Sequence, residues 1–312
     1  MIKSFGPGAA LILACSIAAV GPVQAQGINI ESGTIQGGAL ETRNDPIRIG
    51  DEVVINGRVG SRNGSITIGN QVSAEQVTTR NGSISIGQGG QFGDISTRNG
   101  SVRIGPGNQF GEVDSRNGQV NIGSESVSKS LSNRNGSITI GQGSTVNGNA
   151  DTRNGALKLE SGVRVTGDTT TRNGRISLAP GVEVSGKAVT RNGNIELDNA
   201  VVVEGLESMT GDLILNNASR VDGDLVIEMD ENAASGGRFL WFSRRSEYPD
   251  AGNIRILGNS EVGGNVVVIL PADYDGEPPV VEIEAGSTVH GDIRVDERVE
   301  LITNGTVGGR IE

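Results

Sequence analysis

The sequence predicts an all-β protein that folds as a single-stranded β-helix, also called a β-solenoid. An Arg-Asn-Gly triplet recurs at intervals of 18 or 19 residues, and each copy leads into a short stretch where apolar and polar residues alternate. The chain holds 49 glycines but only 3% aromatic residues. Large aromatic side chains normally dominate core burial. We therefore expect a thin core of Ile, Val and Leu that is repeated many times.

The triplet defines the repeat unit. A divergent copy, Arg43-Asn44-Asp45, precedes the first full triplet by 19 residues. The arginines of the full triplets are Arg62, Arg80, Arg98, Arg116, Arg134, Arg153, Arg172 and Arg191. Units of this size cannot bury an apolar face alone, so they must stack on one another.

Three short apolar patches recur in each unit. The first is an alternating strand, and its predicted inward residues include Ile66, Ile68, Ile84, Ile86, Ile138 and Ile140. The second lies about twelve residues after the arginine, at Phe92, Phe110, Val146, Val165, Val184 and Val203. The third includes Val77, Ile95, Val113, Leu131, Ala150 and Leu206. Three patches predict a triangular rung, and about 14 rungs at ~4.8 Å give a length of about 65 Å.

The Arg-Asn-Gly corner follows from the same alternation. If Ile66 and Ile68 point inward, counting back places Asn63 near the interior and Arg62 outside. Asn-Gly is a pair favoured where the backbone needs a positive φ. The asparagines of successive rungs should overlie one another, so we expect their side-chain amides to bond from rung to rung.

The chain divides into four segments. Residues 1–25 read as a secretory signal, with Lys3 before an apolar stretch and Val23-Gln24-Ala25 as the cleavage site. A minor alternative is a lipoprotein signal cleaved before Cys15, the only cysteine. Residues 26–231 form the regular solenoid, 232–251 an insert, and 252–312 acidic C-terminal rungs. We expect the protein to be exported to the periplasm or the cell surface.

Charge is placed unevenly along the chain. Residues 27–198 hold 17 Lys/Arg and 16 Asp/Glu, whereas residues 199–312 hold 8 and 21, within a total of -11. Because the mean field of the molecule repels polyanions, we expect no nucleic-acid partner.

The arginine column is the first candidate site. It could be an anion-binding ridge for the phosphates or carboxylates of an envelope polymer. Alternatively, the arginines could be held by corner carbonyls and by scattered acids such as Asp94, Asp114 and Asp151, and this simpler interpretation is preferred.

The insert is the second candidate site, because half of the eight aromatic residues lie there beside two arginines. The residues are Phe239, Trp241, Phe242, Arg244, Arg245 and Tyr248. Aromatic and Arg side chains are enriched at binding hot spots. The insert could bind an envelope protein, a glycan or a lipid surface, or it could fold back as a cover.

Signals for catalysis are sparse. His290 is the only histidine, so neither a His-based triad nor a multi-His metal site is supported. We predict no catalytic residue, metal or cofactor. A polysaccharide-active β-helix remains the alternative, with a carboxylate pair drawn from Asp222, Asp224 and Asp292, although these fit turn positions better.

Two family resemblances add to this interpretation. The segments Gly143-Ser144-Thr145-Val146-Asn147-Gly148 and Gly286-Ser287-Thr288-Val289-His290-Gly291-Asp292-Ile293 resemble rungs of bactofilins, which form polymers in bacteria. The Thr-Arg-Asn-Gly-Ser-Ile rungs resemble the repeats of bacterial adhesin-like domains. These resemblances imply a right-handed β-helix that assembles or adheres. The resulting hypothesis is a non-enzymatic structural or adhesive protein of the cell envelope, which binds a partner or associates end to end.

Overall fold

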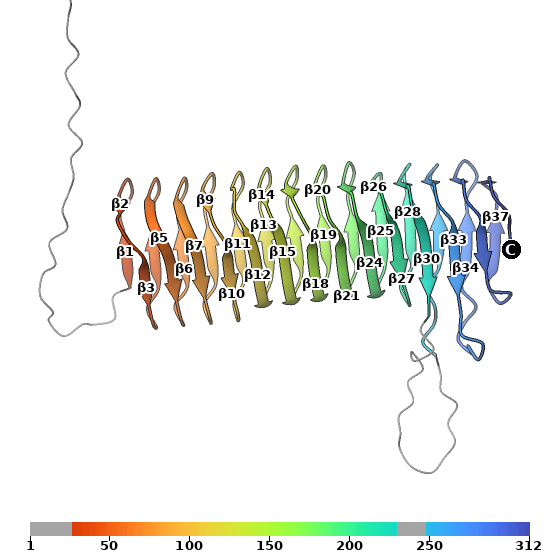
Figure 1. Ribbon diagram of the computed structural model, residues 1–312, viewed down its shortest axis with the longest axis horizontal. Helices are drawn as coiled ribbons and strands as arrows, with labels where there is room; N and C mark the ends of the chain where they lie inside the picture. The colour runs from red at the N-terminus through yellow and green to blue at the C-terminus, as the bar shows by residue number, and fades with distance from the viewer. Residues whose placement is uncertain (1–26, 230–247) are drawn as a thin grey trace, which may run out of the picture.

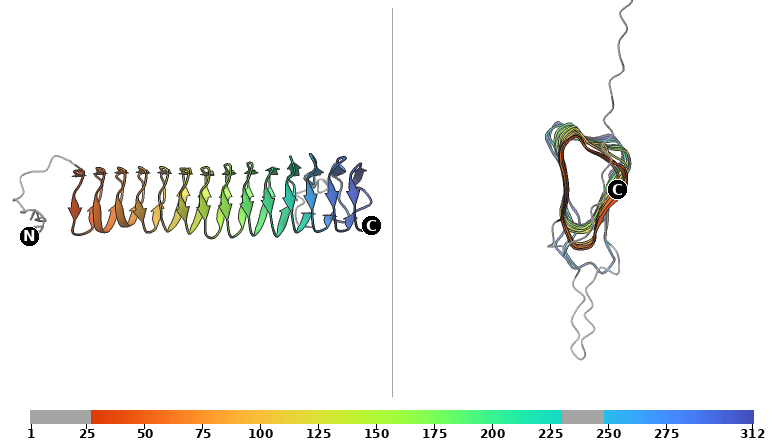
Figure 2. Two further views of the ribbon diagram at one scale, coloured as in Figure 1. Left: turned by 90° about the horizontal axis from the view of Figure 1, so that it is seen from above. Right: turned by 90° about the vertical axis from the view of Figure 1, so that its left-hand side faces the viewer.

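The computed structural model describes residues 27–229 and 248–312, and all regular structure in these ranges is β-strand. Every strand pairing is parallel, and the strands stack along one axis into a rod (Figure 1). Viewed along that axis, the coils superimpose as a three-sided outline (Figure 2). The predicted β-solenoid of about 14 turns is therefore confirmed.

The first side of the rod is a 14-stranded parallel sheet built from the Ile-x-Ile stretches that follow each corner. Its strands, in order, are β1 (Ile28–Ile30), β4 (Ile47–Ile49), β6 (Ile66–Ile68), β8 (Ile84–Ile86), β11 (Val102–Ile104), β13 (Val120–Ile122), β16 (Ile138–Ile140), β19 (Leu157–Leu159), β22 (Ile176–Leu178), β25 (Ile195–Asp198), β28 (Leu213–Asn216), β31 (Ile254–Ile256), β34 (Val280–Ile283) and β37 (Glu300–Thr303).

The second side is formed by the strands that lead into each corner. They are β3 (Leu40–Thr42), β5 (Val54–Ser61), β7 (Ser73–Thr79), β10 (Ile95–Thr97), β12 (Glu112–Asn117), β15 (Ser130–Asn135), β18 (Ala150–Asn154), β21 (Thr169–Asn173), β24 (Lys187–Asn192), β27 (Gly205–Ser208), β30 (Asp224–Glu228), β33 (Val266–Ile269) and β36 (Ile293–Val295). The long strands β5 and β7 begin on the third side, where they pair with β2 (Ile35–Gln36) and β9 (Gln91–Phe92), respectively.

The third side is a nine-stranded sheet of two-residue strands. These are β14 (Val127–Ser128), β17 (Thr145–Val146), β20 (Arg164–Val165), β23 (Glu183–Val184), β26 (Val201–Val202), β29 (Arg220–Val221), β32 (Glu261–Val262), β35 (Thr288–Val289) and β38 (Thr306–Val307). Single bridges through Gln109 continue this side toward the N-terminus, to Gln91 and the start of β7.

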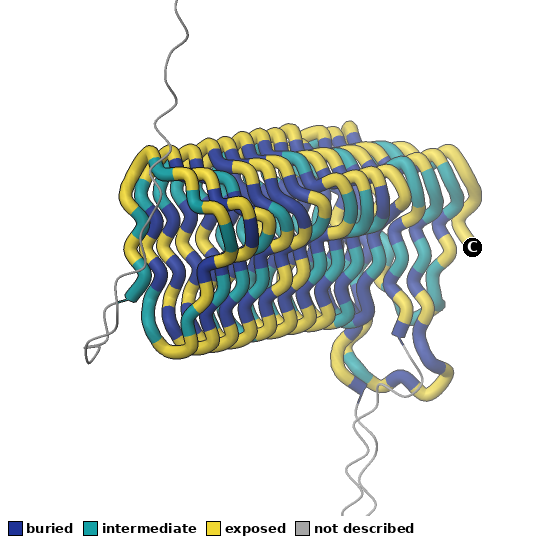
Figure 3. Tube along the Cα trace, turned by 60° about the vertical axis from the view of Figure 1, so that its left-hand side comes forward, coloured by how far each residue is buried: buried dark blue, intermediate teal, exposed yellow. Residues whose placement is uncertain are grey.

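The core is one continuous apolar column inside the coil. Figure 3 shows that buried and exposed positions alternate along the rungs and recur from one rung to the next. The inward residues predicted for the first side are all buried, as are Phe92, Phe110, Val146 and Val184 on the third side. Each rung contributes a few branched aliphatic side chains, and each stacks on its copy in the next rung, as in the register Ile66↔Ile84. Stacked identical shapes pack without large aromatic rings, which explains how 3% aromatic residues suffice.

One residue of the predicted core is misplaced. Val203 is 44% exposed, and its neighbour Val202 is fully buried in register with Val184. The rung between them spans 18 residues, whereas the two preceding rungs span 19. Because side chains alternate across a strand, a difference of one residue exchanges the inner and outer positions.

The corner also differs from the prediction. Asn63 is exposed together with Arg62, whereas Ser61 before them points inward and is buried. Strict alternation does not continue through the turn, so both polar residues lie outside. The asparagines of the full triplets do not adopt a positive φ. Glycine is needed there because of close approach: a Cβ on Gly100 would lie 2.0 Å from the carbonyl oxygen of Gly82 in the rung below.

The rungs continue in register across the insert. Leu213 of β28 pairs with Ile254 of β31, and Ile254 pairs with Val281 of β34. A second excursion, residues 271–279, leaves the rod between β33 and β34. The solenoid therefore tolerates long additions at its corners without a change in stacking.

Candidate ligand-binding ridge

A column of arginine side chains runs along one edge of the rod, where the second side turns into the first. We call Arg43, Arg62, Arg80, Arg98, Arg116, Arg134, Arg153 and Arg172 the arginine ridge. All eight are exposed, and their neighbours are in register, as in Ser115↔Asn133 and Asn117↔Asn135. Arg191 continues the column but is partly buried and has interaction partners.

The residue before most of the arginines anchors the corner from inside. The hydroxyl of Thr97 donates to the carbonyl oxygen of Gly82 at 3.0 Å, and that of Thr171 donates to Gly155 at 3.0 Å. Asn133 takes the same role with its amide, which donates to Gly118 at 2.7 Å. These buried bonds join most corners to the rung below and hold the backbone under the ridge, but the buried hydroxyl of Ser115 has no hydrogen-bond partner among the described residues.

The residue after each arginine forms a second fixed column, which we call the asparagine ladder. Each side-chain amide donates to the side-chain oxygen of the previous rung at 2.6–2.8 Å, as predicted. Its members are Asn44, Asn63, Asn81, Asn99, Asn117, Asn135, Asn154, Asn173 and Asn192. An amide nitrogen carries two N–H groups, and the ladder uses one. One N–H donor per rung therefore remains beside the ridge.

The ridge carries charge that the described residues do not neutralise. Several arginines elsewhere have acidic partners: Arg164 pairs with Glu183 at 3.3 Å, and Arg175 with Glu196 at 3.2 Å. Within residues 27–229 and 248–312, no carboxylate lies within ion-pair distance of the eight ridge arginines. The expected pairing with Asp94, Asp114 and Asp151 is therefore wrong.

Those three carboxylates have other positions. Asp94 accepts a hydrogen bond from the backbone N–H of Glu112, and Asp151 accepts one from the Thr170 hydroxyl. Partial burial raises the pKa of the Asp151 carboxyl, and the Thr170 hydrogen bond opposes that shift. Asp114 is exposed on the outer face of β12.

A third column runs parallel to the ridge on the second side. In register order it comprises Thr78, Ser96, Asp114, Ser132, Asp151 and Thr170, and we call it the hydroxyl–carboxylate column. A shallow groove lies between its last four members and Arg116, Arg134, Arg153 and Arg172. The groove thus offers cations on one flank and hydroxyl and carboxylate groups on the other.

The insert candidates fall largely beyond the described structure. Phe239, Trp241, Phe242, Arg244 and Arg245 lie outside the described residues. Tyr248 is described and is only 8% exposed. Its hydroxyl donates to Asp273 at 2.8 Å, and its ring lies 6.0 Å from that of Tyr274.

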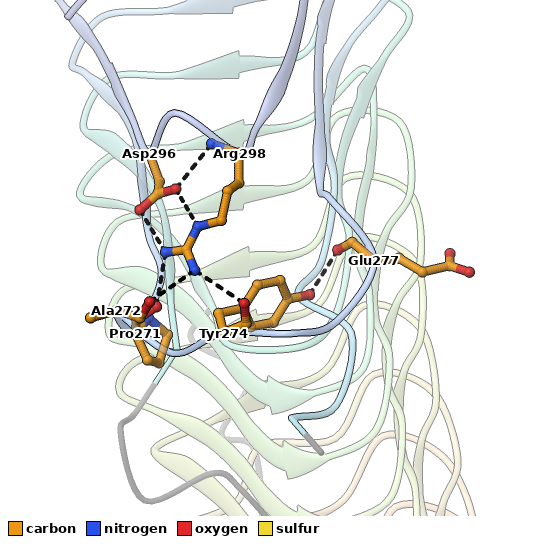
Figure 4. A network of polar contacts seen from close by, with 6 residues as sticks. All are labelled: Pro271, Ala272, Tyr274, Glu277, Asp296 and Arg298. Atoms are coloured by element: carbon orange, nitrogen blue, oxygen red, sulfur yellow. Dashed lines mark hydrogen bonds and ion pairs between the residues drawn. The ribbon is translucent and has the colours of Figure 1, made fainter. Parts of the chain in front are cut away.

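A polar network around Arg298 has no counterpart among the sequence-based expectations (Figure 4). The guanidinium pairs with Asp296 at 2.7 Å and donates to the carbonyl oxygens of Pro271 and Tyr274 at 2.8 and 3.1 Å. The Arg298 hydrogen bonds lower the pKa of Asp296, and burial raises the pKa of the Tyr274 hydroxyl. The network ties the excursion at 271–279 to the last rungs. In the sequence, only the prolines at the two ends of this excursion indicate an ordered loop.

The carboxylates proposed for catalysis act as corner acceptors or ion-pair partners. Asp224 accepts the backbone N–H of Asn265 at 2.6 Å, and Asp292 accepts that of Arg310 at 2.9 Å. Asp222 pairs with Arg220. In the part of the chain that the structure describes, no group of three or more His, Cys, Asp or Glu side chains could hold a metal ion. That part also contains no helix long and apolar enough to span a membrane.

The fold and the ridge define the chain as a β-helix repeat protein with an extended cationic edge. Comparison with protein-family models, with curated proteins and with solved structures gives no significant match.

Proposed function

We propose that this protein is an exported, non-enzymatic scaffold of the bacterial cell envelope that binds an extended anionic partner along the arginine ridge. The observation that carries the proposal is a column of eight exposed arginines that pair with no carboxylate of the described residues. The column lies within residues 27–198, where charges nearly balance, and the acidic excess that gives the whole molecule its negative field lies in residues 199–312. Neighbouring guanidinium groups at ~4.8 Å repel one another by about 1 kcal/mol or less per pair in water. Such a column opposes folding slightly, and an anionic ligand removes the repulsion.

Export is supported by the basic and apolar N-terminal sequence, which lies outside the described residues. The adhesive role is supported by the likeness of the rungs to those of bacterial adhesin-like domains and bactofilins. A non-enzymatic role is supported by the positions of Asp222, Asp224 and Asp292, each of which is already hydrogen-bonded or ion-paired. Because the ligand is an acceptor for guanidinium groups, attachment is expected to weaken with salt.

The experiment measures sedimentation of the purified chain with bacterial envelope fragments at low and at high salt. The test variant replaces Arg98, Arg116, Arg134 and Arg153 with Gln. The control variant makes the same change at the ion-paired residues Arg164, Arg175, Arg220 and Arg255. We expect the test variant to lose most of its attachment and the control to keep it. Equal attachment of both variants would overturn the proposal.

End-to-end association is a second proposed mode of action. In the described rungs, β37 pairs only with β34, so its other edge offers unpaired backbone groups. Ile302 on β37 and Ile311 in the last rung are 36% and 54% exposed. An apolar edge of this kind favours contact with another strand.

A further inference from the structure

The groove beside the arginine ridge differs from a simple cationic track. Its opposite flank carries the Asp114 and Asp151 carboxylates, two rungs apart, with Ser132 between them and Thr170 beyond. Carboxylates accept hydrogen bonds and repel anions, whereas hydroxyls both donate and accept. A ligand that fits this groove must therefore present anions to one flank and hydrogen-bond donors to the other.

We propose that the groove binds a linear polysaccharide of uronic acids, laid along the rod with its carboxylates toward the arginine ridge. This inference rests on the proposed function and specifies the ligand class. Each uronic acid unit carries a planar carboxylate, which matches the fork of a guanidinium group. Each unit also carries free hydroxyls, which can donate to Asp114, Asp151 and the Thr170 oxygen and can exchange bonds with Ser132.

A polyphosphate chain fits the same groove less well. It presents acceptors on every side and has no hydroxyl that could donate to Asp114 or Asp151. The arginine ridge attracts the phosphate groups of such a chain, but the Asp114 and Asp151 carboxylates repel them. The described residues thus favour a polymer that alternates charged and hydroxyl groups over one that is charged throughout.

The regular spacing of the ridge suits a polymer with a short, constant repeat. Successive arginines are one rung apart, or ~4.8 Å, and a pyranose unit has a comparable length. The carboxylates of a straight uronate chain therefore remain aligned with the ridge arginines, whether every carboxylate or every second one faces the ridge. The free N–H of each asparagine in the ladder provides an additional donor beside the carboxylates.

The first experiment compares polygalacturonate, inorganic polyphosphate of equal total charge and dextran as ligands for the full chain at one salt concentration. We expect polygalacturonate to bind more tightly than polyphosphate and dextran not to bind. Replacing four of the eight ridge arginines, Arg98, Arg116, Arg134 and Arg153, with Gln should weaken polygalacturonate binding about 16-fold or more, at about two- to fivefold for each exposed ion pair.

The second experiment tests the carboxylate flank directly. Asp114→Ser combined with Asp151→Ser should weaken polygalacturonate binding about fivefold or more, because the charged acceptors of the sugar hydroxyls are replaced by shorter, neutral ones. The same change should strengthen polyphosphate binding, because repulsion is removed. Glu183→Ser combined with Glu261→Ser changes the net charge equally on the third side and should shift neither affinity by more than about twofold. Circular dichroism melting checks that all variants fold.

The outcomes separate the two proposals. The polyuronate inference is overturned if polyphosphate binds as tightly as polygalacturonate. It is also overturned if the Asp114/Asp151 variant loses affinity for neither ligand. The envelope assay with the ridge variant decides the proposed function independently. If polygalacturonate does not bind but ridge-dependent envelope attachment persists, the ligand class is wrong and the ridge function stands.

Discussion

The side-chain amide of Asn117 donates a hydrogen bond to the side-chain oxygen of Asn99 at 2.8 Å, and Asn99 in turn donates to Asn81 at 2.7 Å. The ladder bonds lie at the surface but repeat in every rung from Asn44 to Asn192. They hold the corner in register and also line the ridge. A change at one asparagine therefore affects two rung contacts.

Replacing Asn99 with Ala should lower the free energy of unfolding by about 1–2 kcal/mol, because two exposed amide hydrogen bonds are lost and water replaces them in part. Asn147 is a suitable control, since its exposed side chain has no hydrogen bond within the described residues. Asn147→Ala should change stability by less than about 0.5 kcal/mol. Urea unfolding of both variants measures the difference. Equal effects would mean that the ladder does not stabilise the fold.

The glycine of the corner should tolerate no side chain. Gly100→Ala places a Cβ 2.0 Å from the carbonyl oxygen of Gly82, so we expect a loss of about 3 kcal/mol or more. Gly37→Ala provides a matched control, because no neighbouring atom lies within 4 Å of the position that its Cβ would take. Thermal melting distinguishes the two. A mild effect at Gly100 would show that rungs can separate locally at the corner.

Neighbouring valines test the corrected register of β26. Val202→Ala should lower the free energy of unfolding by about 2 kcal/mol, because a fully buried side chain is truncated. Val203→Ala should have an effect of less than about 0.5 kcal/mol, because the side chain is already partly in water. Chemical denaturation of the pair is the measurement. The reverse order of effects would contradict the assigned register.

Acid should loosen the last rungs through Asp296. The hydrogen bonds from Arg298 hold the pKa of Asp296 below its ordinary value of 3.8, and bonds from the Arg310 backbone and Arg294 do the same for Asp292. A lowered folded pKa gives stability that is complete above the ordinary value and is lost as the pH falls through the folded pKa. Asp151 acts with the opposite sign, because its pKa is raised.

The urea midpoint of the wild-type protein should therefore fall as the pH drops from about 5 to about 2. At neutral pH, Asp296→Asn should unfold at a lower urea concentration than wild type. It should also lose less stability in acid, because one of the two carboxyl groups with a lowered pKa has been removed. Parallel pH curves for wild type and variant would show that the Asp296–Arg298 pair does not contribute to folding.

End-to-end association should grow with protein concentration. It should also grow with salt, because salt screens the acidic C-terminal third. Ile302→Lys combined with Ile311→Lys should suppress it by placing charge on the exposed edge. Light scattering measures the mass. A strict monomer at high concentration and high salt would exclude this mode of assembly.

The period of the fold can be read from the sequence, because each rung is held mainly by contacts with its own copies. Ile66 stacks on Ile84 at a separation of 18 residues, and this spacing is visible in the letters alone. The side on which Asn63 lies cannot be read, since alternation stops at a turn whose angles depend on the close approach of Gly64 to Asp45. Val203 is misplaced for a related reason, a change of one residue in rung length.

The position of the arginine ridge can be predicted from the sequence, but whether its arginines pair with carboxylates cannot. The recurrence of arginine shows that the side chains align, yet Asp114 and Asp151 are close enough in sequence to suggest ion pairs. In the structure they lie on the face of the second side, while the arginines stand at the corner. The contact of Arg298 with Pro271 joins residues 27 apart across an excursion, and no periodic pattern marks it.

The uniform Arg-Asn-Gly corner also affects how the number of rungs can change during evolution. Each rung contacts only the rungs before and after it, so duplication or loss of one unit leaves the remaining units in their original environment. Such an event would lengthen or shorten the arginine ridge by one step without altering the chemistry of any step. The length of the arginine ridge can thus change during evolution through the number of rungs alone.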